Sequence, residues 1–247
     1  MVYDTITIIA ILVAFALGGI LKGATGAGAP VVTIPVIAAF YDVRIAVIIM
    51  VVPNLLTNIG QLYQFRKTIL PSFFTVSFAL GGGIGAFIGT ILLANLSIKI
   101  LTLSVAFIVI IYILLKLIVP SWKLIYEKAA KLVFIMGTAG GVLQGAAGLS
   151  APISITFLNA MKLERNQFIP TISVYFGVMS IFQMPTLYYY DFLNFEIIVA
   201  SLISTVVLLS FMPLGSWVAK SVSKENFDKI TLILLAFIAL RIIYLNL

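Results

Sequence analysis

The chain has neither cysteine nor histidine among its 247 residues. Disulfides, thiol nucleophiles, zinc sites built from Cys and His, and histidine proton relays are therefore excluded. Charged residues make up only 9% of the sequence, whereas a soluble domain carries about 25%. The eight carboxylates all lie at or near predicted loops, so no mid-span acid is available as a proton relay or general base. The sequence thus predicts no metal site, no cofactor and no enzyme.

Long apolar runs fill most of the chain. Hydrophobic residues make up 62% of it and the mean hydropathy is +1.22, and runs near 20 residues, enough to span a bilayer, recur along its length. The net charge of +7 fits basic loops facing an anionic leaflet better than nucleic acid, for which no basic arm or RNA-binding motif is present. The first residues, MVYDTITIIAIL, lack a basic region and a cleavage site, so we expect a retained membrane element.

A Gly-rich pattern that ends in proline occurs twice, as GGILKGATGAGAP at 18–30 and as GGVLQGAAGLSAP at 140–152. Such interruptions of apolar runs survive in a membrane only where protein or a water-filled cavity satisfies the backbone. Matched interruptions in two halves point to the substrate site of a secondary transporter. The halves also match beyond this pattern. Gln61 corresponds to Gln183 in the same register as Pro30 and Pro152. After a four-residue insertion in the second half, Gly89 and Ser97 correspond to Gly215 and Ser223.

These patterns predict an all-α integral membrane protein of two homologous, inverted repeats, each a Gly/Pro-broken helical hairpin plus three transmembrane helices. The first repeat would cover 1–120 and the second 132–247, joined by a polar loop at 121–131. The run at 5–40 would be about 54 Å long as one helix, too long for a single span. We therefore expect hairpins of two short arms at 5–40 and 132–160. Helices are expected at 45–65, 70–94, 98–119, 168–190, 195–219 and 227–247.

Charge placement favours the hairpins over simple spans. With simple spans, basic residues divide evenly between the two sides of the membrane. With hairpins, one side keeps only Arg44, Lys99 and Arg241, which is the asymmetry of the positive-inside rule. This topology predicts both termini outside a prokaryotic cytoplasmic (inner) membrane. The basic residues that gather inside are Arg66, Lys67, Lys116, Lys123, Lys128, Lys131, Lys162, Arg165, Lys220, Lys224 and Lys229.

Lys22 is the basic residue that lies deepest in an apolar run, with its nearest charged neighbours at Asp4 and Asp42. An intramembrane charge is costly and is by default a functional hypothesis. The alternative is a lysine that snorkels to a headgroup. Its counterpart in the second half is Gln144, so one cation and one amide would face the same site.

The breaks themselves supply ligands for an anion. Each would create a helix N-terminus, whose free N–H groups and positive dipole end suit a negative ligand, and proline fits its first turn. The alternative is that the glycines only permit close helix packing. The candidate residues here are Lys22, Thr25, Gly26, Ala27 and Gly28, with Gln144, Ala147, Gly148 and Ser150.

Polar side chains follow one face of the predicted helix 45–65, at Asn54, Thr57, Asn58 and Gln61. Buried amides need partners, so this face should point inward, either as contacts between helices or as a pathway. The match of Gln61 with Gln183 favours the pathway. The candidate binding residues are Asn54, Asn58, Gln61, Ser173 and Gln183.

A separate glycine series, Gly81, Gly85 and Gly89, has small-xxx-small spacing. In an apolar run this spacing predicts close packing between two spans and not nucleotide binding. The glycines of the first break also lack the strand–helix context of a dinucleotide fingerprint.

The doubled motif, followed in the first half by VVPNLLTNIGQLYQF, resembles the TauE/SafE sulfite exporter family (TSUP) over nearly the whole chain. The resemblance implies transport of small sulfur anions such as sulfite, sulfoacetate or thiosulfate across the bacterial inner membrane. The second copy departs from the pattern where Ser150 stands opposite Gly28 and Phe176 opposite Asn54. The motif residues carried over are Gly23, Gly26, Gly28, Pro30, Asn54, Gln61, Gly145, Gly148, Pro152 and Gln183.

The sequence thus predicts a secondary transporter that exports or imports a small sulfur-containing anion by alternating access, at a mid-membrane site between the two hairpin tips. An anion channel and a transporter of a non-sulfur solute are the alternatives. The coupling ion would be H⁺ or Na⁺, the latter held by carbonyls exposed at the breaks. The expected partners are the anion, the coupling ion and the bilayer, with no nucleic acid, and the oligomeric state is left open.

Overall fold

The computed structural model describes residues 5–118, 123–221 and 224–246, and the elements within them are all helical. Predictions that fall on 1–4, 119–122, 222–223 and 247, including the match at Ser223, lie outside the described residues. The helices are α1 (Thr5–Thr25), α2 (Ala29–Phe40), α3 (Val43–Phe65), the 3₁₀ turn η1 (Arg66–Thr68), α4 (Ser72–Asn95), α5 (Ile98–Ile118), α6 (Tyr126–Ala147), α7 (Ser154–Ala160), α8 (Arg165–Tyr189), α9 (Phe195–Ser221) and α10 (Lys224–Asn246).

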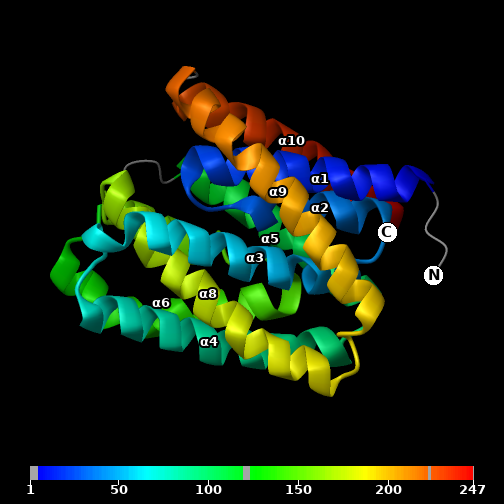
Figure 1. Ribbon diagram of the computed structural model, residues 1–247, viewed down its shortest axis with the longest axis horizontal. Helices are drawn as coiled ribbons and strands as arrows, with labels where there is room; N and C mark the ends of the chain where they lie inside the picture. Colours follow the sequence, from blue (N-terminus) through cyan, green and yellow to red (C-terminus); the bar gives the residue numbers. More distant parts are fainter. Residues whose placement is uncertain (1–4, 119–122, 222–223, 247) are drawn as a thin grey trace.

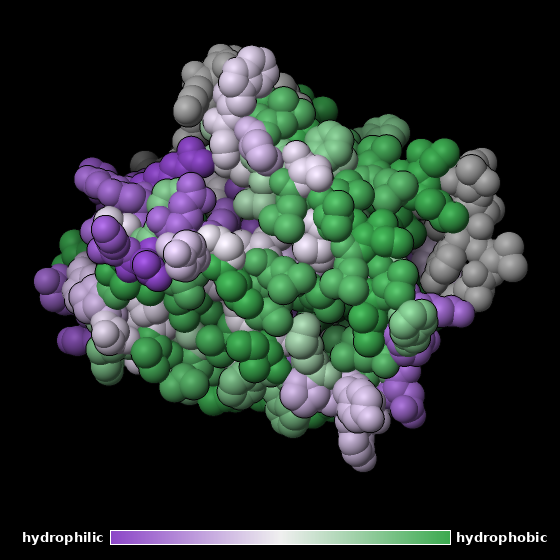
Figure 2. Space-filling view, viewed as in Figure 1, coloured by the Kyte–Doolittle hydropathy of each residue, from purple (hydrophilic) through white to green (hydrophobic). Residues whose placement is uncertain are grey.

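Seven of the described helices, α1, α3, α4, α5, α6, α8 and α9, are long and apolar enough to cross a membrane. The apolar stretches Ala29–Ala39 of α2 and Thr231–Tyr244 of α10 are shorter. Figure 2 shows hydrophobic residues spread over the middle of one face, with hydrophilic residues gathered towards its two ends. Such a belt suits a lipid environment, because exposed apolar surface of this extent is rare on soluble monomers. The prediction of an all-α, multi-pass membrane protein is confirmed.

The two broken runs form hairpins of unequal arms. In the first, α1 has 21 residues and α2 has 12; in the second, α6 has 22 and α7 has 7. The Thr33 hydroxyl donates to the Ala14 carbonyl, and Gly28 lies beside Leu21, so α1 and α2 run antiparallel. The expectation of two short arms is therefore wrong, because the first arm of each hairpin is as long as a full span.

The long arms result from glycines that stay inside the helices. A methyl group added at Gly23 would come 2.0 Å from the Met212 carbonyl oxygen of α9, and one at Gly145 would come 2.3 Å from the Ala86 carbonyl oxygen of α4. Glycine at these positions lets two helix backbones approach closely without interrupting either helix. The predicted packing by Gly81, Gly85 and Gly89 is confirmed, and its partner is α6.

These close contacts occur as equivalent pairs in the two halves. Gly145 follows Gly23 by 122 positions, the offset from Pro30 to Pro152, and Met212 follows Ala86 by 126, the offset from Gly89 to Gly215. The α1–α9 contact therefore has the same register as the α6–α4 contact. A second equivalent pair is formed by Gly215 with Ile20 and by Gly89 with Val142.

Helices α3 and α8 carry the polar faces and lie side by side across the centre of the molecule (Figure 1). Asn54 contacts Ser180 and Gln61 contacts Ser173, so the two helices run antiparallel. The chain enters α1 and leaves α10 at the same end of the bundle (Figure 1).

Most helix ends lie close to the predicted ranges, with one clear difference at the middle of the chain. Helix α6 begins at Tyr126, inside the segment 121–131 that the sequence analysis assigned to a loop. Residues 126–131 read YEKAAK and combine strong helix formers, so polarity at this point does not end the helix.

Candidate functional site

The first turn, between α1 and α2, is built on left-handed backbone. Gly26 has φ +82° and Gly28 has φ +94°, a region that residues with a Cβ rarely adopt. The Thr25 hydroxyl donates to the carbonyl oxygens of Leu21, at 2.8 Å, and of Ala27, so it closes the turn. Pro30 then lies in the first turn of α2, where its missing N–H costs nothing.

The second turn, between α6 and α7, is built differently. Gly148 ends α6 with φ +71°, and its N–H donates to the Gln144 carbonyl oxygen. The Ser150 and Ser154 hydroxyls share a hydrogen bond of 2.9 Å. Helix α7 begins only at Ser154 and has seven residues. The predicted helix N-terminus therefore lies after Pro152 and not within the Gly-rich break at 148–152. A helix this short has only a weak dipole.

Each turn packs against a helix of the other half. A methyl group at Gly26 would meet Ile169, the fifth residue of α8, and one at Gly148 would meet Val47, the fifth residue of α3. Because α3 and α8 are antiparallel, the two turns lie towards opposite ends of this pair. The two tips therefore do not meet, and a site between them would lie along the facing sides of α3 and α8; its position at mid-membrane stays a prediction.

A continuous polar network connects the first hairpin with both central helices. Lys22 Nζ donates to Asn58 Oδ1 at 2.9 Å, Asn58 Nδ2 donates to Asn54 Oδ1 at 2.9 Å, and Asn54 Nδ2 donates to Ser180 Oγ at 3.2 Å. All four side chains are buried. Asn54 is the central residue of α3, with eleven helical residues on either side, so the network reaches the middle of that helix.

Among the described residues, the neighbours of the Lys22 amine are an amide and an aromatic ring, and no carboxylate pairs with it. Its amine contacts the Asn58 amide oxygen and lies 6.0 Å from the centroid of the Phe176 ring. The side chain is 1% exposed, so it does not snorkel to the surface. A buried charge without a counter-charge is expensive, so a charged Lys22 would be stabilised by an anion beside it.

The glutamines of the two halves differ in their partners. Ser173 Oγ donates to Gln61 Oε1 at 3.4 Å, whereas both amide atoms of Gln183 and the oxygen of Gln144 are buried without a hydrogen-bond partner among the described residues. The position of the first half that matches Ser173 is Val51, which carries no hydroxyl. Gln183 therefore lacks the equivalent of the hydrogen bond that Gln61 receives from Ser173. Buried amides without partners are rare and mark a place where a polar ligand gains hydrogen bonds.

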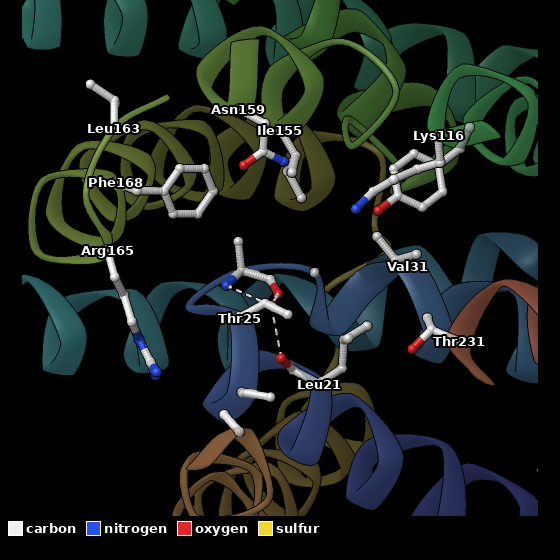
Figure 3. A pocket seen from close by; sticks show the side chains of 15 residues that line it. Leu21, Thr25, Val31, Lys116, Ile155, Asn159, Leu163, Arg165, Phe168 and Thr231 are labelled. Carbon is white, nitrogen blue, oxygen red and sulfur yellow. Dashed lines mark hydrogen bonds between the residues drawn. The ribbon is translucent and has the colours of Figure 1, made fainter. Parts of the chain in front are cut away.

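A cavity of about 320 Å³ lies at the first turn, lined by residues of α1, α2, α5, α7, α8, α9 and α10. Thr25, Ala27 and Gly28 line it, whereas Lys22 is buried outside its lining. Figure 3 shows the Asn159 amide and the Lys116 amine directed into the hollow.

The candidate residues thus fall into separate groups. Lys22, Asn54 and Asn58 belong to the network, Gln61 pairs with Ser173, and Thr25, Ala27 and Gly28 line the cavity, whereas Gly26 packs against Ile169. Ala147, Gly148 and Ser150 form the second turn, at the opposite end of α3 and α8.

Sequence reasoning left several polar residues out of the predicted site. Ser180 of α8 was not among the predicted residues, although it receives the hydrogen bond from Asn54. Lys116 and Arg165 were counted only towards topology, and Asn159 had no signal. Their convergence depends on which helices meet at the first turn.

Comparison with known proteins agrees with this architecture at the level of a family. Neither a curated protein nor a solved structure matches the chain. The model of the sulfite exporter TauE/SafE family matches residues 10–242, nearly the whole chain. The chain therefore belongs to the TauE/SafE sulfite exporter family.

Proposed function

We propose that this protein is a secondary transporter that moves a small sulfur-containing anion, of the sulfite type, by alternating access. Membership of a family of sulfite exporters supports a membrane transporter of sulfite-type anions. The observation that carries the proposal is Lys22, whose buried amine is held by an uncharged amide. An anion at this amine supplies the counter-charge that the protein does not.

The polar network gives the anion its hydrogen-bond donors. A sulfite or sulfonate oxygen accepts from Lys22 Nζ in a charge-assisted bond, which is about twice as strong as a neutral one. The amide groups of Asn58 and Asn54 exchange their mutual hydrogen bonds for bonds to the anion. Ser180 extends the site to α8, so both halves of the chain contact the substrate.

The equivalent packing of α1 on α9 and of α6 on α4 supports two inverted repeats, at 1–120 and 132–247. Antiparallel α3 and α8 fit the same relationship. In such transporters, movement of one repeat against the other opens a central site to each side in turn. The amides of Gln144 and Gln183 would serve the anion on the path towards the second turn.

The positive-inside rule orients this arrangement. With the basic loops in the cytoplasm, both termini lie outside, and the cavity beside Lys116 and Arg165 opens inward. The membrane is the prokaryotic inner membrane, as the family implies.

Transport in proteoliposomes tests the proposal. We expect saturable flux of radiolabelled sulfite, with competition by thiosulfate or sulfoacetate and little competition by chloride. Lys22→Met should lower this flux at least about tenfold, which corresponds to 1.4 kcal/mol of lost binding. The matched control is Lys131→Met, which removes an exposed lysine of α6 and should leave the flux unchanged.

Two results would contradict the proposal. Flux that survives Lys22→Met would remove the buried cation from the mechanism. Flux that fails to saturate and far exceeds carrier rates would indicate a channel instead.

A further inference from the structure

The centre of the α3–α8 pair is formed by two facing positions on each helix. Asn54 Nδ2 of α3 donates to Ser180 Oγ of α8 at 3.2 Å. Asn58 lies one turn after Asn54, and Phe176 lies one turn before Ser180, whose hydroxyl donates to the Phe176 carbonyl oxygen at 3.1 Å. Because the two helices are antiparallel, this register sets Asn58 opposite Phe176.

The repeat relationship exchanges these positions between the two helices. The offset of 122 that matches Pro30 with Pro152 also matches Asn54 with Phe176 and Asn58 with Ser180. Three of the four positions carry a polar side chain, and the fourth carries a phenyl ring. The symmetry of the centre is therefore broken at Phe176, where the first half has an amide.

The Phe176 ring lies next to the buried amine of α1. Lys22 Nζ is 6.0 Å from the centroid of this ring and donates to Asn58 Oδ1 at 2.9 Å. The Phe176 side chain is buried. An anion that reaches the amine therefore meets amide groups on the α3 side and an aromatic ring on the α8 side.

Other side chains fix the position of this ring. The Tyr175 ring packs edge-on against it at 5.6 Å between centroids, and stacks on the Phe78 ring of α4 at 3.9 Å. The Tyr175 hydroxyl donates to the Gly137 carbonyl oxygen of α6 at 3.0 Å. Close packing of this kind leaves a side chain little freedom to move, so Phe176 forms a fixed apolar wall beside Lys22.

We propose that Phe176 is a specificity-determining residue of the Lys22 site, which selects anions with three oxygens and a fourth position that is not oxygen. This inference rests on the proposed function and deepens it. The three oxygens accept hydrogen bonds from Lys22 and from the amides of Asn58 and Asn54, and the fourth position faces the ring.

The chemistry of the wall gives the reason for this selection. The face of a phenyl ring carries partial negative charge and offers no hydrogen-bond donor, so an oxygen held against it is repelled and stays unpaired. The lone pair of sulfite, the carbon of an alkyl sulfonate and the terminal sulfur of thiosulfate need a donor less, because sulfur and carbon are weak acceptors or none. Sulfate, with four oxygens, should be rejected.

Thiosulfate and sulfate give a direct test, because these tetrahedral dianions differ only in one sulfur that replaces one oxygen. Each is titrated against the thermal stability of the purified protein. Sulfate also stabilises proteins in general, so the shift of Lys22→Met at the same concentration is subtracted. We expect half-maximal stabilisation at a concentration at least about tenfold lower for thiosulfate than for sulfate.

Variants of Phe176 then identify the source of the preference. Phe176→Asn gives the fourth oxygen a donor, so sulfate should gain and the preference should fall to about threefold or less. Phe176→Leu keeps the wall apolar and should retain the preference. If Phe176→Asn does not fold, the smaller polar change Phe176→Thr has the same expected result. The matched controls are Phe182→Asn and Phe182→Leu, because Phe182 lies on the same helix but packs beside Gly83 of α4; both should leave the preference unchanged.

Three results would overturn the proposal: no thiosulfate preference in the unaltered protein, a preference that survives the polar change at Phe176, or its loss in Phe176→Leu. Flux in proteoliposomes separates this failure from failure of the transport proposal. Unsaturable flux would contradict the transporter and leave the thiosulfate preference intact. Saturable flux that depends on Lys22, with sulfate competing as well as thiosulfate, would overturn only the role of Phe176.

Discussion

Lys22 and Asn58 lie 36 positions apart in the sequence, and their side chains meet at 2.9 Å in the interior. The orientation of the Asn58 amide is fixed from the other side. Its Nδ2 donates to the carbonyl oxygen of Asn54 at 2.6 Å and to Asn54 Oδ1 at 2.9 Å. Asn58 Oδ1 therefore has to face Lys22, and the network holds the amine in place without neutralising it.

Replacing this amide by a carboxylate should block anion binding. Asn58→Asp gives Lys22 a permanent counter-charge, so an anion then competes with it. We expect the sulfite affinity, measured by titration of thermal stability, to fall at least about tenfold, or 1.4 kcal/mol. Asn95→Asp, at an exposed position at the end of α4, serves as the control for an added charge outside the network and the cavity. An unchanged affinity in Asn58→Asp would show that the anion does not bind at Lys22.

The unpartnered amide of Gln183 should cost stability in the protein without substrate. Gln183→Leu removes two buried atoms that have no hydrogen-bond partner among the described residues, and we expect the free energy of unfolding to rise by about 1 kcal/mol. The equivalent change, Gln61→Leu, should lower it, because the Ser173 hydroxyl loses its acceptor. Thermal unfolding in detergent compares the two. If Gln183 binds substrate, Gln183→Leu should also reduce transport, and equal shifts for both variants would contradict the assignment.

The glycines between helices should not tolerate even a methyl group. Gly23→Ala and Gly145→Ala bring a Cβ within 2.3 Å of a backbone oxygen on the facing helix, and overpacking of this kind costs about 1–3 kcal/mol. Gly60→Ala and Gly177→Ala are matched controls, since no atom lies within 4 Å of the added methyl. They should be neutral or stabilising by up to about 1 kcal/mol. Similar unfolding temperatures for all four variants would argue against the close α1–α9 and α4–α6 contacts.

The two left-handed glycines of the first turn should differ in sensitivity. Gly28→Ala adds a methyl with only ordinary contacts, so its cost is the left-handed backbone, about 1–2 kcal/mol. Gly26→Ala has the same backbone cost and also brings the methyl 2.4 Å from the Ile169 side chain, so it should be less stable than Gly28→Ala. Unfolding temperatures rank the two variants. The reverse order would mean that the turn does not pack on α8 as described.

The helices themselves follow from local patterns that a sequence displays directly. Apolar runs such as Ile98–Ile118 have to form helices in a bilayer, because no water is present to satisfy the backbone. The selection of Lys22, Asn54 and Asn58 also rested on a local argument, the cost of burying polar groups. The network confirms that these side chains meet, whereas their role in binding stays a prediction.

Other features depended on contacts between distant segments. Gly23 and Gly145 looked like breaks, but each lies inside a helix because a neighbouring backbone fills the space above it. The same residue type can end a helix or permit a close contact, and only the facing helix decides which. The cavity was missed for a similar reason, since Lys116 and Asn159 are 43 positions apart in the sequence and line the same cavity only in the folded chain.

The sequence by itself determined that the chain lies in a lipid bilayer, where its helices are, that its two halves resemble each other, and which family it resembles. These features depend on hydrophobicity, spacing and repeated motifs, which can be read along the chain without knowing its fold. The tertiary structure alone decided that Lys22 pairs with Asn58, that the two turns lie at opposite ends, and that a cavity opens at the first turn. The physical reason is packing. An open space depends on several helices at once, here on the seven helices whose residues line this cavity.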